Sequence, residues 1–462
     1  MEEEAIHMPS AGGSRGRALG QEAVSRPVDL DQVSAHEGER LQTGIAELDR
    51  VLGGGVVPGS LILLAGEPGI GKSTLALQVA GRLGQQERPA LYVSGEESAA
   101  QIRLRASRLE CVSPRIRVLA DPDLPTVLGA IERDRPRLVV VDSMQTIFDP
   151  ALPGSPGGTT QVKEAAVQLL FLANQTGIPV LINGHVTKEK TVAGPKALEH
   201  TVDVVLYLEG ERDGAHRLLR SHKNRFGPSD ELGIFEMGDH GLLELSPADA
   251  SRAFIDEATQ GVPGNVLTIT CEGSRPLAVE VQALVARTRF GLPRRVSSGF
   301  DLGRLHLLIA VLEKRCGLDF SEQDVYLNVA GGIKLTEPSG DLAVALAMAG
   351  SLRDLSVPAD CFAIGEVGLG GEVRRVRRLE ERAREATALG LVMAIGASDL
   401  RDRPGLHVTP VRTVAEALEG QHSLLVPGGT IQGALPAVSL PPPHVAAPSG
   451  SGRGRGSRRR SA

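Results

Sequence analysis

The stretch that decides the fold is LILLAGEPGIGKS, residues 61–73. Its first five residues are aliphatic or small, as in a buried strand, and a good helical pattern occupies residues 74–83 after it. Between them lies Gly66-x-x-x-x-Gly71-Lys72-Ser73. Strand, glycine-rich turn and helix in this order are the context that a phosphate-binding P-loop requires. The sequence therefore predicts a nucleotide-binding α/β domain.

This loop predicts a site for ATP and Mg²⁺. Glycines allow backbone N–H groups to turn around phosphates at the start of a helix, where anions are favoured. Lys72 is expected to reach the β- and γ-phosphates, and the Ser73 hydroxyl to bind Mg²⁺. The predicted nucleotide-binding residues here are Gly66, Glu67, Pro68, Gly69, Ile70, Gly71, Lys72, Ser73 and Thr74.

Carboxylates follow two other strand-like runs. Asp142 closes the run LVVVD at residues 138–142, and we expect it to hold Mg²⁺ together with Ser73. The alternative for Asp142 is an ordinary turn residue. Glu96 and Glu97 follow the run ALYVS at residues 90–94. One of them is expected to orient and deprotonate the attacking water, with Glu96 preferred over a merely solvated acidic turn.

The pattern along the chain predicts two globular blocks. In residues 42–245, short apolar runs alternate with helical stretches, which is typical of a mainly parallel sheet covered on both faces. These runs are residues 61–65, 90–94, 138–142, 180–183 and 204–208. A linker is expected at 246–264 and a separate α+β domain at 265–425, with strands at 266–270 and 278–281 and helices at 304–315 and 341–352. Residues 1–41 and the basic stretch 426–462 are expected to be disordered.

Composition excludes several classes of protein. A formal net charge of −6 argues against a generally basic nucleic-acid-coating protein, although a local basic groove is compatible with it. The four cysteines form no CxxC pair, so we expect neither zinc nor a disulfide framework. The N-terminus is acidic with no apolar run behind it, and no apolar stretch is long enough to cross a bilayer. We therefore expect a cytoplasmic protein that does not contact the membrane.

Several further segments carry a family resemblance. TGIAELD at 43–49 and LGGG at 52–55, followed by the P-loop, resemble the entry to the RecA-type ATPase core. GEES at 95–98, LEHTVD at 198–203 and above all KNRFG at 223–227 are similar to the RadA/Sms family of bacterial DNA-repair ATPases. The resemblance covers residues 42–425 and implies a RecA-type core followed by a Lon-protease-like domain.

The resemblance also implies an activity and partners. The expected function is a DNA-dependent ATPase, a helicase-like motor that processes recombination intermediates by branch migration during DNA repair. Its expected partners are single-stranded and branched DNA, further copies of itself in a hexameric ring, and the RecA recombinase as a candidate. The alternatives are an ATP-dependent peptidase and a RecA-type switch that does not act on DNA; the second alternative would lack KNRFG.

Residue roles follow from the same resemblance. Lys223 and Arg225 are expected to stabilise charge on a neighbouring subunit's nucleotide, the alternative being a basic surface turn. His185 matches a γ-phosphate sensor, although a lone histidine at a strand end is commonly structural. The lysines after it match a DNA-binding loop: Lys188, Lys190 and Lys196. Family members usually begin with a four-cysteine zinc finger, whereas the first cysteine here is Cys111, so any function of that finger is in doubt.

The second block resembles the proteolytic domain of Lon, which uses a serine and a lysine. Ser339 aligns with the serine and Glu380 with the lysine. Because a glutamate reverses the charge that would activate the serine, peptidase activity is not expected. Ser339 is instead expected to cap the helix at 341–352. Four arginines are candidate phosphate contacts or, equally, a solvated face: Arg374, Arg375, Arg377 and Arg378.

Overall fold

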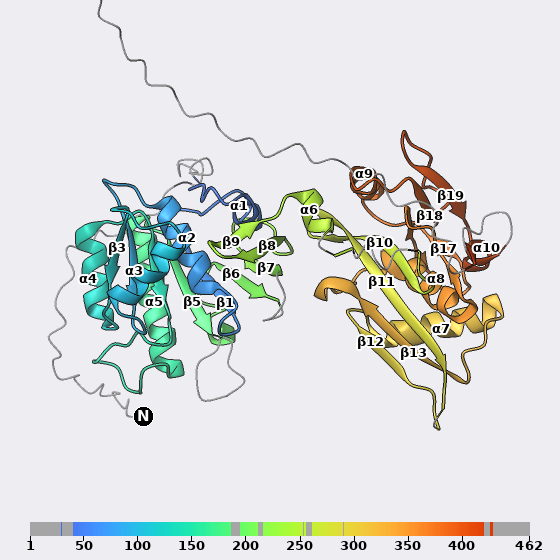
Figure 1. Cartoon of the computed structure of the whole chain (residues 1–462). Helices are drawn as coiled ribbons and strands as arrows, with labels where there is room; N and C mark the ends of the chain where they lie inside the picture. The colour runs from blue at the N-terminus through green and yellow to red at the C-terminus, as the bar shows by residue number, and fades with distance from the viewer. Residues whose placement is uncertain are drawn as a thin grey trace, which may run out of the picture. The chain divides into compact units, whose positions relative to one another are not determined.

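The computed structural model describes residues 29, 40–185, 195–210, 216–252, 254–255, 261–289, 291–419 and 426–427 (Figure 1). The chain divides after Arg40, and Leu41–Ala462 is the second and larger unit. Every helix and strand named below belongs to the second unit. Lys188 and Lys190 lie outside the described residues, as do nearly all of the two expected disordered ends.

A nine-stranded sheet forms the first block, in the order β3-β2-β4-β5-β1-β6-β7-β8-β9. The six strands from β3 to β6 in this order run parallel, and β7, β8 and β9 extend the sheet antiparallel. The strands are β1 Leu61–Gly66, β2 Ala90–Ser94, β3 Ile116–Leu119, β4 Val139–Asp142, β5 Val180–His185, β6 Val204–Glu209, β7 His216–Asn224, β8 Leu232–Gly238 and β9 Gly241–Glu244. The predicted α/β class with a mainly parallel sheet is confirmed.

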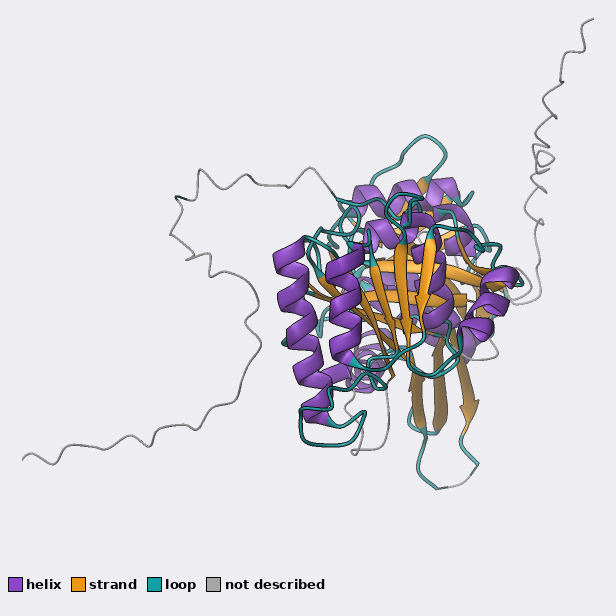
Figure 2. Ribbon diagram, turned by 90° about the vertical axis from the view of Figure 1, so that its left-hand side faces the viewer, coloured by secondary structure: helices purple, strands orange, loops and turns teal. Residues whose placement is uncertain are grey.

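Helices cover both faces of this sheet (Figures 1 and 2). Ile62 and Leu64 of β1 share a buried cluster with α1 (Ala46–Val51), α2 (Lys72–Leu83) and α3 (Ala99–Arg108). Leu61 and Leu63 face the other way, into a cluster with α4 (Leu124–Asp134) and α5 (Thr159–Thr176). Burial on both faces explains why the strands are continuous apolar runs rather than alternating ones.

The second block is built on a seven-stranded sheet, in the order β12-β13-β11-β10-β15-β18-β19. Its strands are β10 Asn265–Glu272, β11 Arg275–Arg287, β12 Arg295–Ser298, β13 Gln323–Val329, β15 Cys361–Ile364, β18 Met393–Ala397 and β19 His407–Val411. Two short pairs accompany it: β14 Leu355–Ser356 with β20 Val426–Pro427, and β16 Glu366–Val367 with β17 Val373–Arg374.

Its helices are α7 Leu302–Cys316, α8 Asp341–Arg353, α9 Leu379–Ala388 and α10 Val414–Leu418, with short 3₁₀ turns η4 Ala330–Gly332 and η5 Pro338–Gly340. The first ten residues of α8 are all buried, so this helix is apolar on every side and forms the centre of the block's core. The α+β pattern expected for residues 265–425 is therefore present in the described part of the block.

The segment expected to be a linker contributes to the core. It contains α6, Pro247–Arg252, and both Ala250 and Phe254 are buried among side chains of the second block such as Val279. Because most of the residues around Ala250 and Phe254 are polar, the composition of the segment did not indicate that these two would be buried. Consistent with that packing, Leu41–Ala462 is one compact unit rather than two units joined at residues 246–264.

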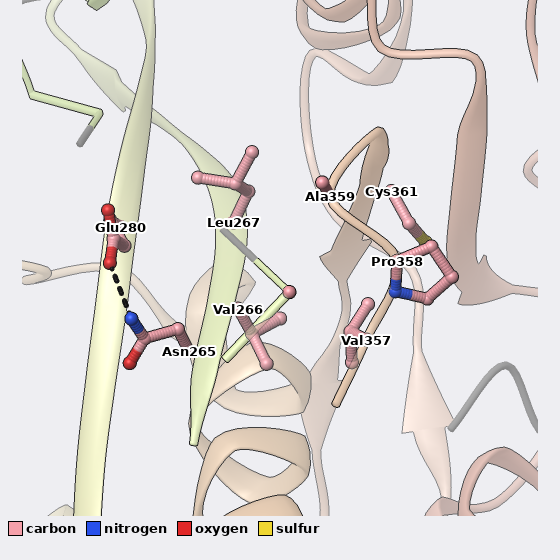
Figure 3. Close-up of a pocket in the computed structure, with 9 residues that line it drawn as sticks. Asn265, Val266, Leu267, Glu280, Val357, Pro358, Ala359 and Cys361 are labelled. Carbon is pink, nitrogen blue, oxygen red and sulfur yellow. Dashed lines mark hydrogen bonds between the residues drawn. The ribbon is translucent and has the colours of Figure 1, made fainter. Parts of the chain in front are cut away.

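A small pocket lies in the second block, between β10, β11 and the segment that leads into β15 (Figure 3). Asn265 donates a hydrogen bond from Nδ2 to Oε1 of Glu280 at 2.9 Å on one side of it. Val357, Pro358 and Cys361 form the other side. None of the residues predicted to bind nucleotide or DNA lines this pocket.

Candidate nucleotide-binding and hydrolytic site

The P-loop lies where β1 ends and α2 begins. Gly66 is paired with His185 of β5 on one side and with Leu208 of β6 on the other. The strands approach so closely that a Cβ on Gly66 would lie 2.5 Å from the carbonyl oxygen of Leu208. Gly71 occupies the N-cap of α2 in the left-handed region, with φ of 117°, and no side chain caps this helix. The first amides of α2 are thus left for an anion.

Lys72 is almost fully buried, with 4% of its surface exposed. Its Nζ donates to the carbonyl oxygens of Gly66 and Glu67, each at 2.9 Å, so the ammonium lies inside the loop. Burial lowers the pKa of Lys72 to about 8, while the carboxylates of Asp142 and Glu96 act in the opposite direction. A phosphate entering the loop would meet this cation directly.

Asp142 ends β4 opposite Ser94 of β2 and is held on both oxygens. The Tyr92 hydroxyl donates to Oδ2, and Nδ2 of Asn183 donates to Oδ1 at 2.9 Å. Burial, followed by the charge of Asp142, raises the pKa of Tyr92 well above its usual value, so the phenol stays protonated as a donor. The charge of this oriented carboxylate acts on Lys72 of the loop, and a carboxylate is a ligand that Mg²⁺ prefers.

Glu96 faces the same space. Ser143 donates a hydrogen bond to Oε1 of Glu96, and Nε2 of His185 lies 3.7 Å from that oxygen. His185 and Ser143 outweigh partial burial and lower the pKa of Glu96 to about 2, so it is a carboxylate at neutral pH. Glu97 is instead ion-paired with Arg105 of α3. Of the two glutamates, Glu96 is the one whose charge acts on Lys72.

Three residues that shape the site were not predicted from the sequence: Tyr92, Asn183 and Ser143. One signal for Tyr92 was available, because side chains two apart on a strand share a face. Tyr92 therefore shares a face of β2 with Ser94, the residue that pairs with Asp142 in the structure. The contact of Asn183 with Asp142 depends on β5 lying beside β4, and that of Ser143 with Glu96 on β4 lying beside β2; the sequence does not state this lateral order.

Lys223 and Arg225 lie at the opposite edge of the sheet from the P-loop. Lys223 is paired with Val205, near the start of β6, and its Nζ donates to the carbonyl oxygens of Glu199 and Val202 at 2.6 and 2.7 Å. Burial, followed by the charge of Arg225, lowers the pKa of Lys223. Arg225 is 54% exposed, and its Nη1 lies 3.5 Å from Oδ1 of Asp203.

The length of β1 gives the distance between the P-loop and the sheet edge where Lys223 and Arg225 lie. Oδ2 of Asp203 accepts a hydrogen bond at 3.0 Å from the amide of Leu61, the first residue of β1, whereas the P-loop begins at its last residue, Gly66. Six residues of strand span about 17 Å. The structure therefore brings Glu96, Asp142, His185 and the P-loop together but leaves both cations at the far edge. Lys196, exposed in η2 (Pro195–Ala197), shortly precedes β6.

The expected reading of Ser339 and Glu380 in the second block is wrong in two respects. The N-cap of α8 is Gly340, and Ser339 lies in η5, where its Oγ accepts a hydrogen bond from Nη1 of Arg382 at 3.2 Å. Glu380 pairs with Arg403 at the surface. Side chains that are two positions apart on a helix point in nearly opposite directions. Arg382 therefore points inward, whereas Glu380 points outward.

The pairing of Ser339 with Arg382 bears on the peptidase alternative. Arg382 is 1% exposed and forms an ion pair with Glu337 at 2.7 Å. An arginine stays protonated throughout the physiological range and cannot take a proton from a serine. The cation beside Ser339 thus lacks the basic function that a serine–lysine dyad needs.

The arginine cluster before α9 divides by its partners. Arg374 pairs with Glu366 and Glu372, and Arg375 lies 3.8 Å from Asp399. Arg378 donates to the carbonyl oxygen of Gly273, while Arg377 is exposed. These local partners are those expected of a solvated face, and the role in phosphate contact stays a prediction.

In the ranges that the structure describes, no group of three or more His, Cys, Asp or Glu side chains could hold a metal ion. Within the same ranges, no helix has the length and apolar character needed to cross a membrane.

These features define a class of protein: a P-loop nucleotide-binding protein of the RecA-like α/β type, with two carboxylates at the carboxyl edge of its sheet. Comparison with known proteins agrees, because residues 25–191 match the family described as an AAA domain. The solved structure titled "Crystal structure of the RadB recombinase" is 25% identical, has a TM-score of 0.35, and covers 45% of this chain and 100% of its own.

Full-length relatives give the particular family. The DNA repair protein RadA of Bacillus subtilis is 48% identical over 423 residues, which are 90% of this chain and 92% of the relative. RadA of Pseudomonas aeruginosa is 46% identical over 420 residues, again 90% and 92% of the two chains. RadA of Mycobacterium tuberculosis H37Rv is 44% identical over 460 residues, 98% and 93%. The chain belongs to the RadA family of DNA repair proteins, and family membership indicates use of nucleotide and Mg²⁺ with hydrolysis of ATP.

Proposed function

We propose that this protein is a DNA-dependent ATPase that acts as a ring-shaped, helicase-like motor on recombination intermediates and drives branch migration in DNA repair. The observation that carries the proposal is the division of the site between two sheet edges. The P-loop and its carboxylates lie at one edge, and Lys223 and Arg225 lie about 17 Å away at the other. A cation so placed can reach a transferring phosphate only on another copy of the chain.

In this proposal the side chains have separate roles. Lys72 binds the β- and γ-phosphates, and Ser73 and Asp142 hold Mg²⁺, which neutralises phosphate charge when bound. Glu96 accepts a hydrogen bond from the attacking water and takes its proton. Its pKa of about 2 makes it a weak base while Ser143 and His185 hold it, so release of those contacts would make it a better one.

His185 is the proposed link to DNA. It lies at the end of β5 within 3.7 Å of Glu96, and the chain continues from it toward the candidate DNA contacts Lys188, Lys190 and Lys196. One segment that borders both ligands provides a route for DNA to affect hydrolysis, and for nucleotide to affect DNA affinity. The proposed partners are single-stranded and branched DNA, copies of the chain in a hexamer, and the RecA recombinase, all in the cytoplasm.

The test is the rate of ATP hydrolysis with and without single-stranded DNA. Wild-type turnover should rise when DNA is added. Lys72→Ala should remove turnover in both conditions, which controls for contaminating ATPases, and Lys223→Ala should remove the DNA-stimulated turnover. The proposal fails if DNA leaves wild-type turnover unchanged and Lys223→Ala hydrolyses ATP at the wild-type rate.

A further inference from the structure

The geometry points to Arg217 as a positioning residue for the P-loop. Arg217 fixes the direction in which the backbone amide of Gly71 points. Arg217 lies near the start of β7, in a segment outside the P-loop motif. Only 4% of its surface is exposed, although it carries a full charge. Buried charges are retained where they have specific partners, so the contacts of this guanidinium require an explanation.

The guanidinium of Arg217 contacts the P-loop. Nε of Arg217 donates to the carbonyl oxygen of Ile70 at 3.1 Å, and Nη1 donates to the carbonyl oxygen of His216 at 2.9 Å. The guanidinium therefore joins β7 to the peptide that connects Ile70 to Gly71. Ile70 is itself buried, with 2% of its surface exposed, so water has little access to compete for this carbonyl.

A peptide unit is planar, and in the trans form its C=O and N–H point in opposite directions. When Arg217 holds the oxygen of Ile70, it also turns the amide of Gly71 away from β7. Gly71 is the N-cap of α2, and amides at this point of a P-loop are donors to phosphate. Its φ of 117° belongs to a region where glycine has several accessible states, so an external contact is needed to select one.

The loop is held at other points too, but by different means. Lys72 donates to the carbonyl oxygens of Gly66 and Glu67, contacts that it must exchange for those with phosphate in order to bind nucleotide. Arg217 is fixed on β7 and keeps its contact from outside the loop. The arrangement implies that nucleotide affinity depends on a residue that does not touch nucleotide.

The test compares Arg217→Met with Arg220→Met. Methionine fills much of the same space but donates no hydrogen bond. Arg220 lies on the same strand and is ion-paired with Glu209 and the partly buried Glu272, so it controls for loss of a paired arginine from β7. For Arg217→Met we expect the KM for ATP and the Kd for ADP to rise about tenfold, the size of effect of one unpaired buried group. We expect kcat to change less than threefold, and Arg220→Met to leave KM and Kd unchanged.

A purely structural role would lower the Tm without nucleotide and leave KM and Kd as in wild type; that outcome overturns the inference. The rise in Tm produced by saturating ADP is measured in parallel and should shrink only for Arg217→Met. If Arg217→Met fails to fold, the KM of Arg217→Lys is measured in its place. This variant keeps a cation but not the rigid set of donors, so KM should rise about threefold. A wild-type KM in Arg217→Lys would also contradict the inference.

Discussion

The two edges of the nine-stranded sheet carry opposite kinds of contacts. At the carboxyl edge, side chains from β2, β4 and β5 and the P-loop converge, and the charges of Asp142 and Glu96 oppose the lowering of the pKa of Lys72 by burial. At the amino edge, Lys223 and Arg225 make no contact with that group. Lys223 is bound to main-chain carbonyl oxygens, and Arg225 lies beside Asp203.

Under the proposed function, this difference separates what one chain would do alone from what would require a second copy. The carboxyl edge has the residue types for binding nucleotide and metal and for directing a water molecule. Besides Lys72, two cations described at this edge already have partners: Arg105 lies beside Glu97 and Asp142, and Arg217 donates to the carbonyl oxygen of Ile70. The amino edge carries an exposed Arg225 and a partly buried Lys223, which are the two cations that the proposed function assigns to a neighbouring subunit's nucleotide.

The largest expected effect tests whether Lys223 at the amino edge acts on the nucleotide of a neighbouring subunit. Lys223→Ala should lower kcat by about 10³-fold, the size seen when a cation at the γ-phosphate is removed. Mixing Lys223→Ala with Lys72→Ala subunits should restore part of the activity. In a mixed assembly, the P-loop of the first variant can meet Lys223 of the second.

Each variant measured alone is the control for the mixing experiment. Should the mixture show only the sum of the two separate rates, Lys223 does not act between subunits, and the comparison of the two edges loses its functional meaning.

A second prediction concerns the carboxyl edge alone. Glu96→Gln should lower kcat by about 10²-fold, because the amide cannot take a proton from water. The Kd for ADP should stay within about twofold, since Glu96 lies beside the P-loop rather than in it. Glu97→Gln is the matched control, because Glu97 is paired with Arg105, and it should hydrolyse ATP nearly normally. A larger loss in Glu97→Gln than in Glu96→Gln would reverse the assignment.

The pH dependence of nucleotide binding gives a smaller effect. The pKa of Lys72 is lowered to about 8 in the nucleotide-free protein, mainly by burial. Its positive charge is present below that pH and is lost above it, whereas bound phosphates favour the charged form. Binding above pH 8 thus requires uptake of a proton, and the Kd for ADP should rise by up to about tenfold per pH unit.

Titrations with ADP between about pH 7 and pH 9.5 measure this slope. Lys72→Arg remains charged throughout, so its affinity, whatever its level, should not vary with pH. A wild-type Kd that is flat across the range would show that Lys72 keeps its proton without nucleotide.

The smallest effect is expected at Lys196, near the amino edge. Lys196→Ala should weaken binding of single-stranded DNA a few-fold and lower the slope of log K against log salt by about one, as for loss of one phosphate contact. Hydrolysis without DNA should not change. Lys163, exposed on α5, is a comparison lysine whose replacement by alanine should leave DNA binding unaltered. Equal effects of the two substitutions would remove Lys196 from the DNA-binding set.

Much of the first block was predictable because its strands are buried on both faces and its P-loop has a strict sequence context. Five expected strands are present within two residues at each end. β3 was not expected, since it is a short edge strand whose residues Ile116 to Leu119 are only partly buried. An edge strand has one neighbour and one covered face, so its sequence carries a weaker apolar signal.

Contacts between strands were harder to predict than the strands themselves. Nothing in the sequence states that Asn183 of β5 lies beside Asp142 of β4, or that Arg217 of β7 reaches Ile70. In the second block, the sequence did not show that Arg382 is the charged residue that contacts Ser339. A helix turns about 200° over two residues, so Glu380 lies at the surface while Arg382 is buried.

Gly66 has a consequence for how substitutions in this loop should be interpreted. A side chain there would collide with the carbonyl oxygen of Leu208 at 2.5 Å, so β6 requires glycine at this position whether or not nucleotide is present. Replacing Gly66 would separate β1 from β6 in the centre of the sheet. A Gly66 variant that loses activity would therefore report on folding. At Gly69 no atom lies within 4 Å of an added Cβ, but its φ of 81° disfavours any L side chain, so a Gly69 variant would report on the backbone conformation of the loop rather than on a collision with β6.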